Sequence, residues 1–177
     1  ACALAEWKYG AGRGTENMIF LTFGTGMGAG LILNGQLYRG ACGNAGEIGH
    51  VRMAPFGPVG YGKAGSFEGF ASGGGIARLA ATFAEERLQT GAGTAFCRTR
   101  DELSVITAER VATAAKAGDP TALAVYRTCG EMLGAGLALL VDVLNPEVIV
   151  IGSIYTRAEE LLREGMERVL QKEALPA

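Results

Sequence analysis

The residue types best suited to chemistry gather in a glycine-rich loop at residues 24–30, which reads GTGMGAG. The preceding run, Met18–Phe23, is apolar and rich in β-branched and aromatic residues, and it predicts a buried strand. Glycines at this density allow positive φ angles and let main-chain N–H groups approach an anion without a side chain in the way. The loop therefore indicates a phosphate site, although a glycine-rich bulged turn in an ordinary sheet has the same composition.

The segment after the loop decides which kind of phosphate site is expected. The letters fit G-x-G-x-x-A, but a dinucleotide-binding fingerprint requires the loop to open a helix. Instead, two short β-type runs, residues 31–33 and Gln36–Tyr38, flank Asn34-Gly35, a strong hairpin signal because a type I′ turn needs positive φ twice. This pattern favours a phosphate-gripping β-hairpin, as in the actin, hexokinase and heat-shock ATPase group, over a Rossmann oxidoreductase.

Composition limits the partners that the chain could take. Among 177 residues, 16 Lys and Arg face 18 Asp and Glu, the net charge is −2, and no basic run is present. This balance indicates neither a nucleic-acid surface nor a membrane patch, so a small-molecule partner fits better. We see no apolar run near the roughly 18 residues of a membrane span, and the four cysteines form no C-x-x-C pair. We expect a cytoplasmic protein with reduced thiols.

Periodic apolar patterns predict a set of helices around the strands. The predicted helices cover residues 1–9, 76–88, 107–116, 120–144 and 157–172. Ser72 is the expected N-cap of the second helix, although the glycines after it could instead offer N–H groups to an anion. Asp119-Pro120 begins the longest helix and Asn145-Pro146 ends it. Its C-terminal half is apolar nearly all round and should be buried, with glycines that allow close helix packing.

A second apolar run, residues 147–151, predicts a buried strand of the parallel or central kind that ends at Gly152-Ser153. Because ligands of open α/β sheets lie at the carboxyl ends of strands, this turn is a candidate second wall of a nucleotide cleft, or simply a structural turn. Between the two strands, residues 51–53 predict a short strand and residues 55–65 a surface loop.

Three blocks together resemble the ROK family of bacterial sugar kinases, repressors and open reading frames. They are GTGMGAGLILNGQLYRGACGNAGEIGH at 24–50, FEGFASGGGIARLA at 67–80 and NPEVIVIGS at 145–153. The resemblance implies an α/β, actin-like ATPase (ribonuclease H-like) fold with two lobes. Residues 1–177 would be a single partial domain, the larger C-terminal lobe, with a mixed sheet and flanking helices. The N-terminal lobe and the extreme C-terminus would lie outside this sequence.

The resemblance also implies ATP-dependent phosphorylation of a hexose hydroxyl, with ATP and Mg²⁺ as cofactors. By position, the nucleotide-binding candidates are Gly24, Thr25, Gly26, Gly28, Gly152 and Ser153. The sugar-binding candidates are Glu47, His50 and Glu68. Carboxylates and imidazole suit contacts with sugar hydroxyls, because they accept hydrogen bonds and histidine can also donate them. Without the resemblance, Glu47 would be taken for a solvated residue and His50 for a satisfied loop residue.

The zinc site of many family members has no counterpart here. In them the histidine of GEIGH and three cysteines bind the metal, whereas residues 60–66 read GYGKAGS, one residue shorter and without cysteine. Because thiolate ligands close such structural sites, we expect no zinc. Packing by Phe56, Tyr61 and Phe67 would then hold His50 in place.

The general base of the family is an aspartate just before a segment that ACALAE, residues 1–6, resembles. We therefore expect that aspartate upstream of Ala1, no catalytic residue within this chain, and little or no activity from the isolated chain. The parent protein would be a sugar kinase or, alternatively, a sugar-responsive repressor with a helix-turn-helix elsewhere. The expected partners are a sugar, a nucleotide and a second copy of the protein in a homodimer, with no membrane and no nucleic acid bound by this segment.

Overall fold

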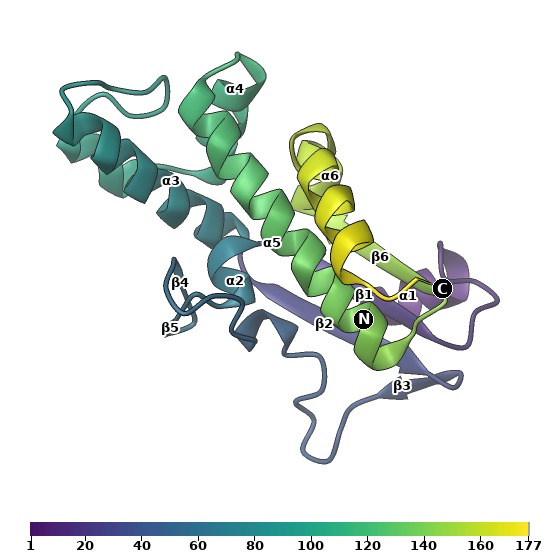
Figure 1. Cartoon of the computed structure of the whole chain (residues 1–177). Coiled ribbons are helices and arrows are strands. Elements are labelled where there is room, and N and C mark those ends of the chain that lie inside the picture. Colours follow the sequence, from purple (N-terminus) through teal and green to yellow (C-terminus); the bar gives the residue numbers. More distant parts are fainter. Residues whose placement is uncertain (177) are drawn as a thin grey trace.

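The computed structural model describes residues 1–176, which fold around a four-stranded mixed sheet (Figure 1). The strand order is β3-β2-β1-β6. The strands are β1 (Met18–Phe23), β2 (Met27–Leu33), β3 (Gln36–Tyr38) and β6 (Val148–Ser153). Strand β1 pairs antiparallel with β2 and parallel with β6, so the glycine turn and the end of β6 lie at the same edge of the sheet.

Helices and two short strands complete the fold. The helices are α1 (Cys2–Tyr9), α2 (Phe67–Phe70), α3 (Gly73–Gln89), α4 (Ala108–Lys116), α5 (Pro120–Leu144) and α6 (Ile154–Glu173). A small hairpin consists of β4 (Val59–Gly60) and β5 (Lys63–Ala64), and 3₁₀ turns occur at η1 (Ile48–His50) and η2 (Arg100–Val105). The α/β architecture with a mixed sheet and flanking helices is the predicted one.

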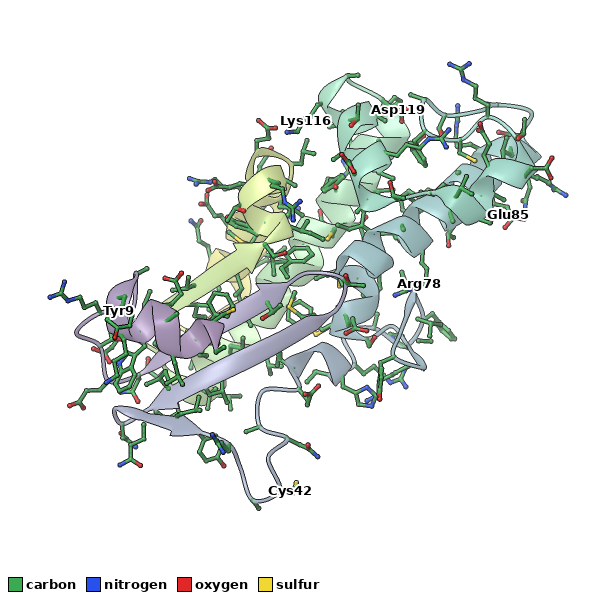
Figure 2. The ribbon with its side chains drawn as sticks, turned by 180° about the vertical axis from the view of Figure 1, so that it is seen from behind. Tyr9, Cys42, Arg78, Glu85, Lys116 and Asp119 are labelled. Carbon is green, nitrogen blue, oxygen red and sulfur yellow. The ribbon has the colours of Figure 1, made fainter. Side chains whose placement is uncertain are left out.

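Strand β1 is buried on both faces of the sheet. Ile19, Leu21 and Phe23 belong to the larger core, which they share with buried residues of α3, α5 and α6. Met18 and Phe20 point to the other face, where a smaller cluster includes residues of α1. Viewed from behind, α1 lies across that face (Figure 2). Because successive side chains of a strand point to opposite faces, β1 contributes residues to both cores.

Helix α5 begins and ends where its sequence predicts. The Asp119 Oδ1 atom accepts hydrogen bonds from the N–H groups of Thr121 and Ala122 at 2.9 and 2.8 Å, and Pro120 occupies the first turn. At the other end, Asn145 takes a left-handed conformation with φ of 41°. Both predicted signals, the N-cap and the residue before proline, are confirmed.

The expectation that the C-terminal half of α5 is buried all round is wrong at two apolar positions. Leu139 and Val143 are 38% and 69% exposed, because only part of the circumference of α5 meets its neighbours α2, α3, α4 and α6. Within residues 1–176, α5 has the length and apolar composition of a membrane span, contrary to the sequence expectation. Of its most apolar window, 56% is buried inside the protein, as in the core helix of a globular fold.

Glycines bring α5 close to its neighbours, as predicted. A Cβ atom on Gly130 would lie 2.5 Å from the carbonyl oxygen of Leu162 in α6, and one on Gly134 would lie 2.3 Å from that of Met166. A Cβ atom on Gly136 would meet the ring of Phe67 at 2.3 Å. These distances leave no room for a methyl group, so glycine sets the separation of the helices.

Three strand predictions need correction. Strand β2 begins at Met27, so the second half of the glycine-rich loop is strand and only residues 24–26 form the turn. Residues 51–53 form no strand, and Arg52 makes one isolated bridge with Ser66. Strand β6 is half-buried rather than buried, because within residues 1–176 it pairs only with β1.

Two other segments are more regular than predicted. The surface loop at 55–65 contains the β4–β5 hairpin. Helix α6 begins at Ile154, three residues earlier than predicted, and carries one non-helical residue, Ala158. The four cysteines are free thiols, with Cys97 and Cys129 buried and Cys2 and Cys42 exposed; Cys42 lies at the tip of the loop that follows β3 (Figure 2).

Candidate functional site

The turn between β1 and β2 is tied to the first residues of α3. The N–H groups of Gly73 and Gly74 donate to the carbonyl oxygens of Gly24 and Thr25 at 2.8 and 3.3 Å. The hydroxyl of Ser72 caps α3 by accepting from the N–H of Gly75 at 2.9 Å. The expected N-cap is therefore confirmed, and the glycines after it hold the turn through their backbone.

Two glycines, one in the turn and one at the start of α3, lie close to neighbouring side chains. A Cβ atom on Gly26 would lie 2.7 Å from Oε2 of Glu68, and one on Gly73 would lie 2.8 Å from Cδ1 of Ile154. Gly28, another nucleotide-binding candidate, lies inside β2 opposite Thr22, and the space beside it is open. A side chain at position 26 or 73 would therefore displace the end of the Glu68 or Ile154 side chain, while Gly28 leaves the sheet surface bare next to the turn.

The second predicted wall, Gly152-Ser153, lies beside this turn. Thr22 pairs with Gly152 and Phe23 with Ser153 in the parallel register of β1 and β6. Ser153 has φ of 66° and ψ of −113°, a conformation that L residues rarely adopt. Backbone strain of this kind tends to persist at sites where the surrounding structure enforces it.

A cavity of about 470 Å³ lies between the turn, α3 and the start of α6. Thr25, Gly74 and Ser153 border it, together with Arg157, and none of its lining residues is acidic. A second cavity of about 420 Å³ between α4, α5 and α6 shares Ala108, Ile154 and Arg157 with the first. The two cavities therefore adjoin along these three residues and offer a mainly neutral or basic surface next to the turn.

The floor of the second cavity includes a buried phenol. The Tyr126 hydroxyl donates to the carbonyl oxygen of Ala108 at 3.0 Å and so ties α5 to α4. Burial raises the pKa of Tyr126, with a further contribution from the nearby Cys129. The phenol therefore stays protonated at neutral pH and keeps its donor role.

The three sugar-binding candidates border a separate cavity of about 670 Å³ on the other side of the turn. His50 is the last residue of η1, Glu47 directly precedes η1, and Glu68 comes from α2. The remaining lining residues are Met27, Asn44, Gly49 and Tyr61. Residues that are 21 positions apart in sequence are thus brought together, with Glu47 and His50 exposed and Glu68 half-buried.

Glu68 joins this cavity to the glycine turn. Its Oε2 atom accepts the N–H of Met27 at 3.0 Å, directly after the turn. Its own backbone is fixed, because the carbonyl oxygen of Glu68 accepts the hydroxyl of Ser72 at 2.6 Å and Ser66 caps the helix by accepting from Gly69 at 3.1 Å. One carboxylate oxygen thus holds the start of β2, while the residue also borders the cavity.

His50 is supported by the β4–β5 hairpin. The ammonium group of Lys63 donates to the carbonyl oxygen of His50 at 2.7 Å, and the rings of His50 and Tyr61 meet edge to face with centroids 6.3 Å apart. The backbone N–H of Phe67 donates to Val51 next to His50 at 2.8 Å. Phe56, the third aromatic residue expected to help, is instead 84% exposed. The expectation of no zinc stays a prediction.

Sequence reasoning did not identify Asn44, Tyr61 or Arg157 as neighbours of these cavities. Asn44 lies within the block that resembles the ROK family, so its polar amide close to Glu47 was the available signal. Tyr61 and Arg157 reach their positions through the hairpin and the early start of α6, two features that the local sequence pattern did not predict. The general-base aspartate expected upstream of Ala1 stays a prediction.

Comparison with known proteins identifies the family. The profile described as "ROK family" matches residues 1–176. The chain belongs to the ROK family. Its fold is accordingly the actin-like ATPase fold, and a ROK glucokinase from Streptomyces griseus, solved in complex with glucose and AMPPNP, superposes with a TM-score of 0.80 at 30% identity over 99% of this chain and 56% of that one.

Similar sequences include both kinases and regulators. A glucokinase of Halalkalibacterium halodurans is 39% identical over 98% of this chain and 52% of its own length. The DNA-binding transcriptional dual regulator NagC of Escherichia coli is 32% identical over 99% of this chain and 41% of its own length. The chain thus spans about half the length, or less, of the ROK relatives it matches.

Proposed function

We propose that the parent protein is a cytoplasmic, ATP-dependent sugar kinase and that this chain is its larger, C-terminal lobe. The observation that carries the proposal is the position of the glycine turn between two cavities. Thr25 borders the cavity of about 470 Å³, while Met27, two residues later, borders the cavity of about 670 Å³ that holds Glu47, His50 and Glu68. A phosphoryl donor on one side and a hydroxyl acceptor on the other would meet at this turn.

The residues beside Thr25 fit nucleotide phosphates. The lining of that cavity combines backbone groups of glycines, the exposed Thr25 hydroxyl and the Arg157 guanidinium, without a carboxylate to repel an anion. The adjoining cavity of about 420 Å³ would take the nucleoside, and Ser153 borders the cavity of about 470 Å³ next to it. ATP would bring Mg²⁺ bound mainly through its phosphate oxygens, which neutralises charge in phosphoryl transfer.

The residues of the larger cavity fit a sugar. Glu47, Glu68 and His50 can accept hydrogen bonds from neighbouring hydroxyls, and the Asn44 amide can both donate and accept. The glucokinase of Streptomyces griseus, whose structure contains glucose and AMPPNP, supports a hexose as the acceptor. We propose that the second lobe supplies the general base, and that the protein pairs with a second copy of itself.

The second candidate function is sugar-responsive repression. The similarity to NagC supports it, because the sugar-binding candidates would serve a sensor as well as an enzyme. Under this alternative, sugar binding would change the affinity for DNA through a domain outside this chain.

A kinase assay tests the proposal. The full-length protein is incubated with Mg-ATP and a panel of hexoses and amino sugars, and ADP release is coupled to NADH oxidation. We expect saturable, sugar-dependent ADP release with at least one hexose. A protein that phosphorylates no member of the panel would not be a sugar kinase of this class.

A further inference from the structure

The tip of the β4–β5 hairpin has a residue that its turn disfavours. Gly60 pairs with Lys63, so Tyr61 and Gly62 form a two-residue loop, with φ angles of 44° and 76°. Two positive φ angles are the mark of a type I′ turn, which prefers Asn, Asp or Gly at both positions. The turn therefore strains a tyrosine at the first position, and turn geometry does not explain why this residue is present.

The hairpin is anchored to the helix that carries Glu68. A Cβ atom on Gly60 would lie 2.5 Å from the backbone nitrogen of Gly69, and the hydroxyl of Ser66 donates to the carbonyl oxygen of Gly60 at 3.3 Å. The backbone on one side of Tyr61 is thus packed against α2. This contact holds the tip in a defined place relative to Glu68.

The ring of Tyr61 gains little from packing in the protein. It is 88% exposed, and its aromatic neighbour is the exposed His50, which it meets at an interplanar angle of 80°. Nevertheless it borders the same cavity as Glu47, His50 and Glu68. Burial in the core therefore does not account for an aromatic residue at this strained position, whereas a contact with a bound molecule would.

We propose that the Tyr61 ring is a specificity-determining contact that covers one C–H face of the bound sugar. The other side chains of the cavity are mostly polar and suited to hydroxyl groups, whereas a pyranose also has an apolar face. Tyrosine combines an apolar ring with a polar tip, so it can cover that face while its hydroxyl stays in water. This inference rests on the proposed sugar site and assigns to Tyr61 a role that sequence similarity does not supply.

Two substitutions separate a ring contact from a structural role. Tyr61→Asn removes the ring and introduces a residue that the turn prefers, while Tyr61→Phe keeps the ring. The matched control is Phe56→Asn, which removes an aromatic ring that is 84% exposed on the same loop and does not border the cavity. Sugar KM and ATP KM are measured in the full-length protein, together with the Kd of glucose, mannose and N-acetylglucosamine by calorimetry and the Tm.

We expect Tyr61→Asn to raise the sugar KM and Kd by about tenfold, equivalent to about 1.4 kcal/mol, while ATP KM stays the same and Tm does not fall. Tyr61→Phe and Phe56→Asn should each change sugar affinity by less than about twofold. If Tyr61→Asn lowers the yield of folded protein, Tyr61→Gly provides a second ring-free variant that suits the turn.

Each result bears on a different claim. Unchanged sugar affinity in a folded, ring-free variant overturns the role of Tyr61 and leaves the kinase proposal standing. A wild-type protein that binds sugar without phosphorylating it overturns the kinase proposal, and the calorimetric comparison still decides the role of Tyr61. A wild-type protein that binds none of the three sugars and phosphorylates no member of the kinase panel overturns both.

Discussion

Glu68 occupies the point where the two halves of the site meet. Its carboxylate accepts the N–H of Met27 at 3.0 Å, and a Cβ atom on Gly26 would collide with it. The same side chain borders the cavity with Glu47 and His50. Under the proposed function, a residue in this position would contact the sugar directly and act on the glycine turn through Met27, so substitutions can separate the two effects.

Glu68→Gln should raise the sugar KM by about three- to tenfold, because a neutral amide replaces a charged acceptor for sugar hydroxyls. ATP KM should change little, since the amide oxygen of glutamine can still accept the N–H of Met27. Glu68→Ala removes both contacts and should also raise ATP KM. Steady-state kinetics of both variants with each substrate varied in turn checks this, and an unchanged sugar KM in Glu68→Gln would remove Glu68 from the sugar site.

Thr25→Val should weaken nucleotide binding more than sugar binding. The substitution removes a hydroxyl that borders the cavity beside the turn and keeps nearly the same shape. We expect the Kd of ATP to rise by about tenfold, the loss of one hydrogen bond to a charged group, with sugar affinity within about twofold of wild type. Calorimetric titration with each ligand measures this, and equal losses for both ligands would contradict the assignment.

At the residue scale, the sequence was informative wherever a family block reached. Glu47, His50 and Glu68 were assigned by resemblance, and the structure brings them to one cavity. Tyr61 was expected only to hold His50 in place, and local sequence could not show that it borders the cavity. Its position depends on a type I′ hairpin whose first loop residue is not one that the turn prefers.

At the scale of elements, glycines determine how α5 packs on α6. Gly134 would place a Cβ atom 2.3 Å from the backbone oxygen of Met166, whereas a Cβ atom on Gly165 in α6 has its nearest neighbour at 3.2 Å. A backbone atom cannot move aside as a flexible side chain would. The two positions therefore differ in the space they leave for a methyl group: Gly134 leaves none and Gly165 leaves almost enough.

Gly134→Ala should lower the free energy of unfolding by about 1–3 kcal/mol, the usual cost of overpacking. Gly165→Ala should cost less, because a Cβ atom there has its nearest neighbour at 3.2 Å. The small overlap is offset by the better helix propensity of alanine, about 1 kcal/mol. Urea denaturation followed by the fluorescence of Trp7, the one tryptophan, measures both. If Gly134→Ala were as stable as wild type, the close approach of α5 and α6 would be wrong.

Element types followed from sequence more reliably than element limits. Asp119, Pro120 and Asn145 act through their own backbone and side chains, so the bounds of α5 could be predicted locally. The start of β2 at Met27 and the half-burial of β6 depend on which strands pair, which is information that lies outside each segment. The periodicity of a segment does not indicate which distant strand it pairs with, so this part of the fold could not be predicted locally.

At the scale of the whole molecule, the similarity to kinases and to regulators extends over nearly all of this chain but only part of each relative. The chain matches about half the length of a glucokinase and less than half the length of a DNA-binding transcriptional regulator, and both similarities cover nearly all of this chain. The turn with its two flanking cavities is therefore compatible with an enzyme and with a sensor. What distinguishes them is whether phosphate leaves the nucleotide for the sugar.

The most direct measurement is the detection of a sugar phosphate by mass spectrometry after incubation of the full-length protein with Mg-ATP and each hexose. We expect a sugar phosphate formed in equal amount to ADP, with the reaction weakened by Thr25→Val and Glu68→Gln. A protein that binds sugar and shifts its affinity for operator DNA, yet forms no sugar phosphate, would contradict the kinase assignment.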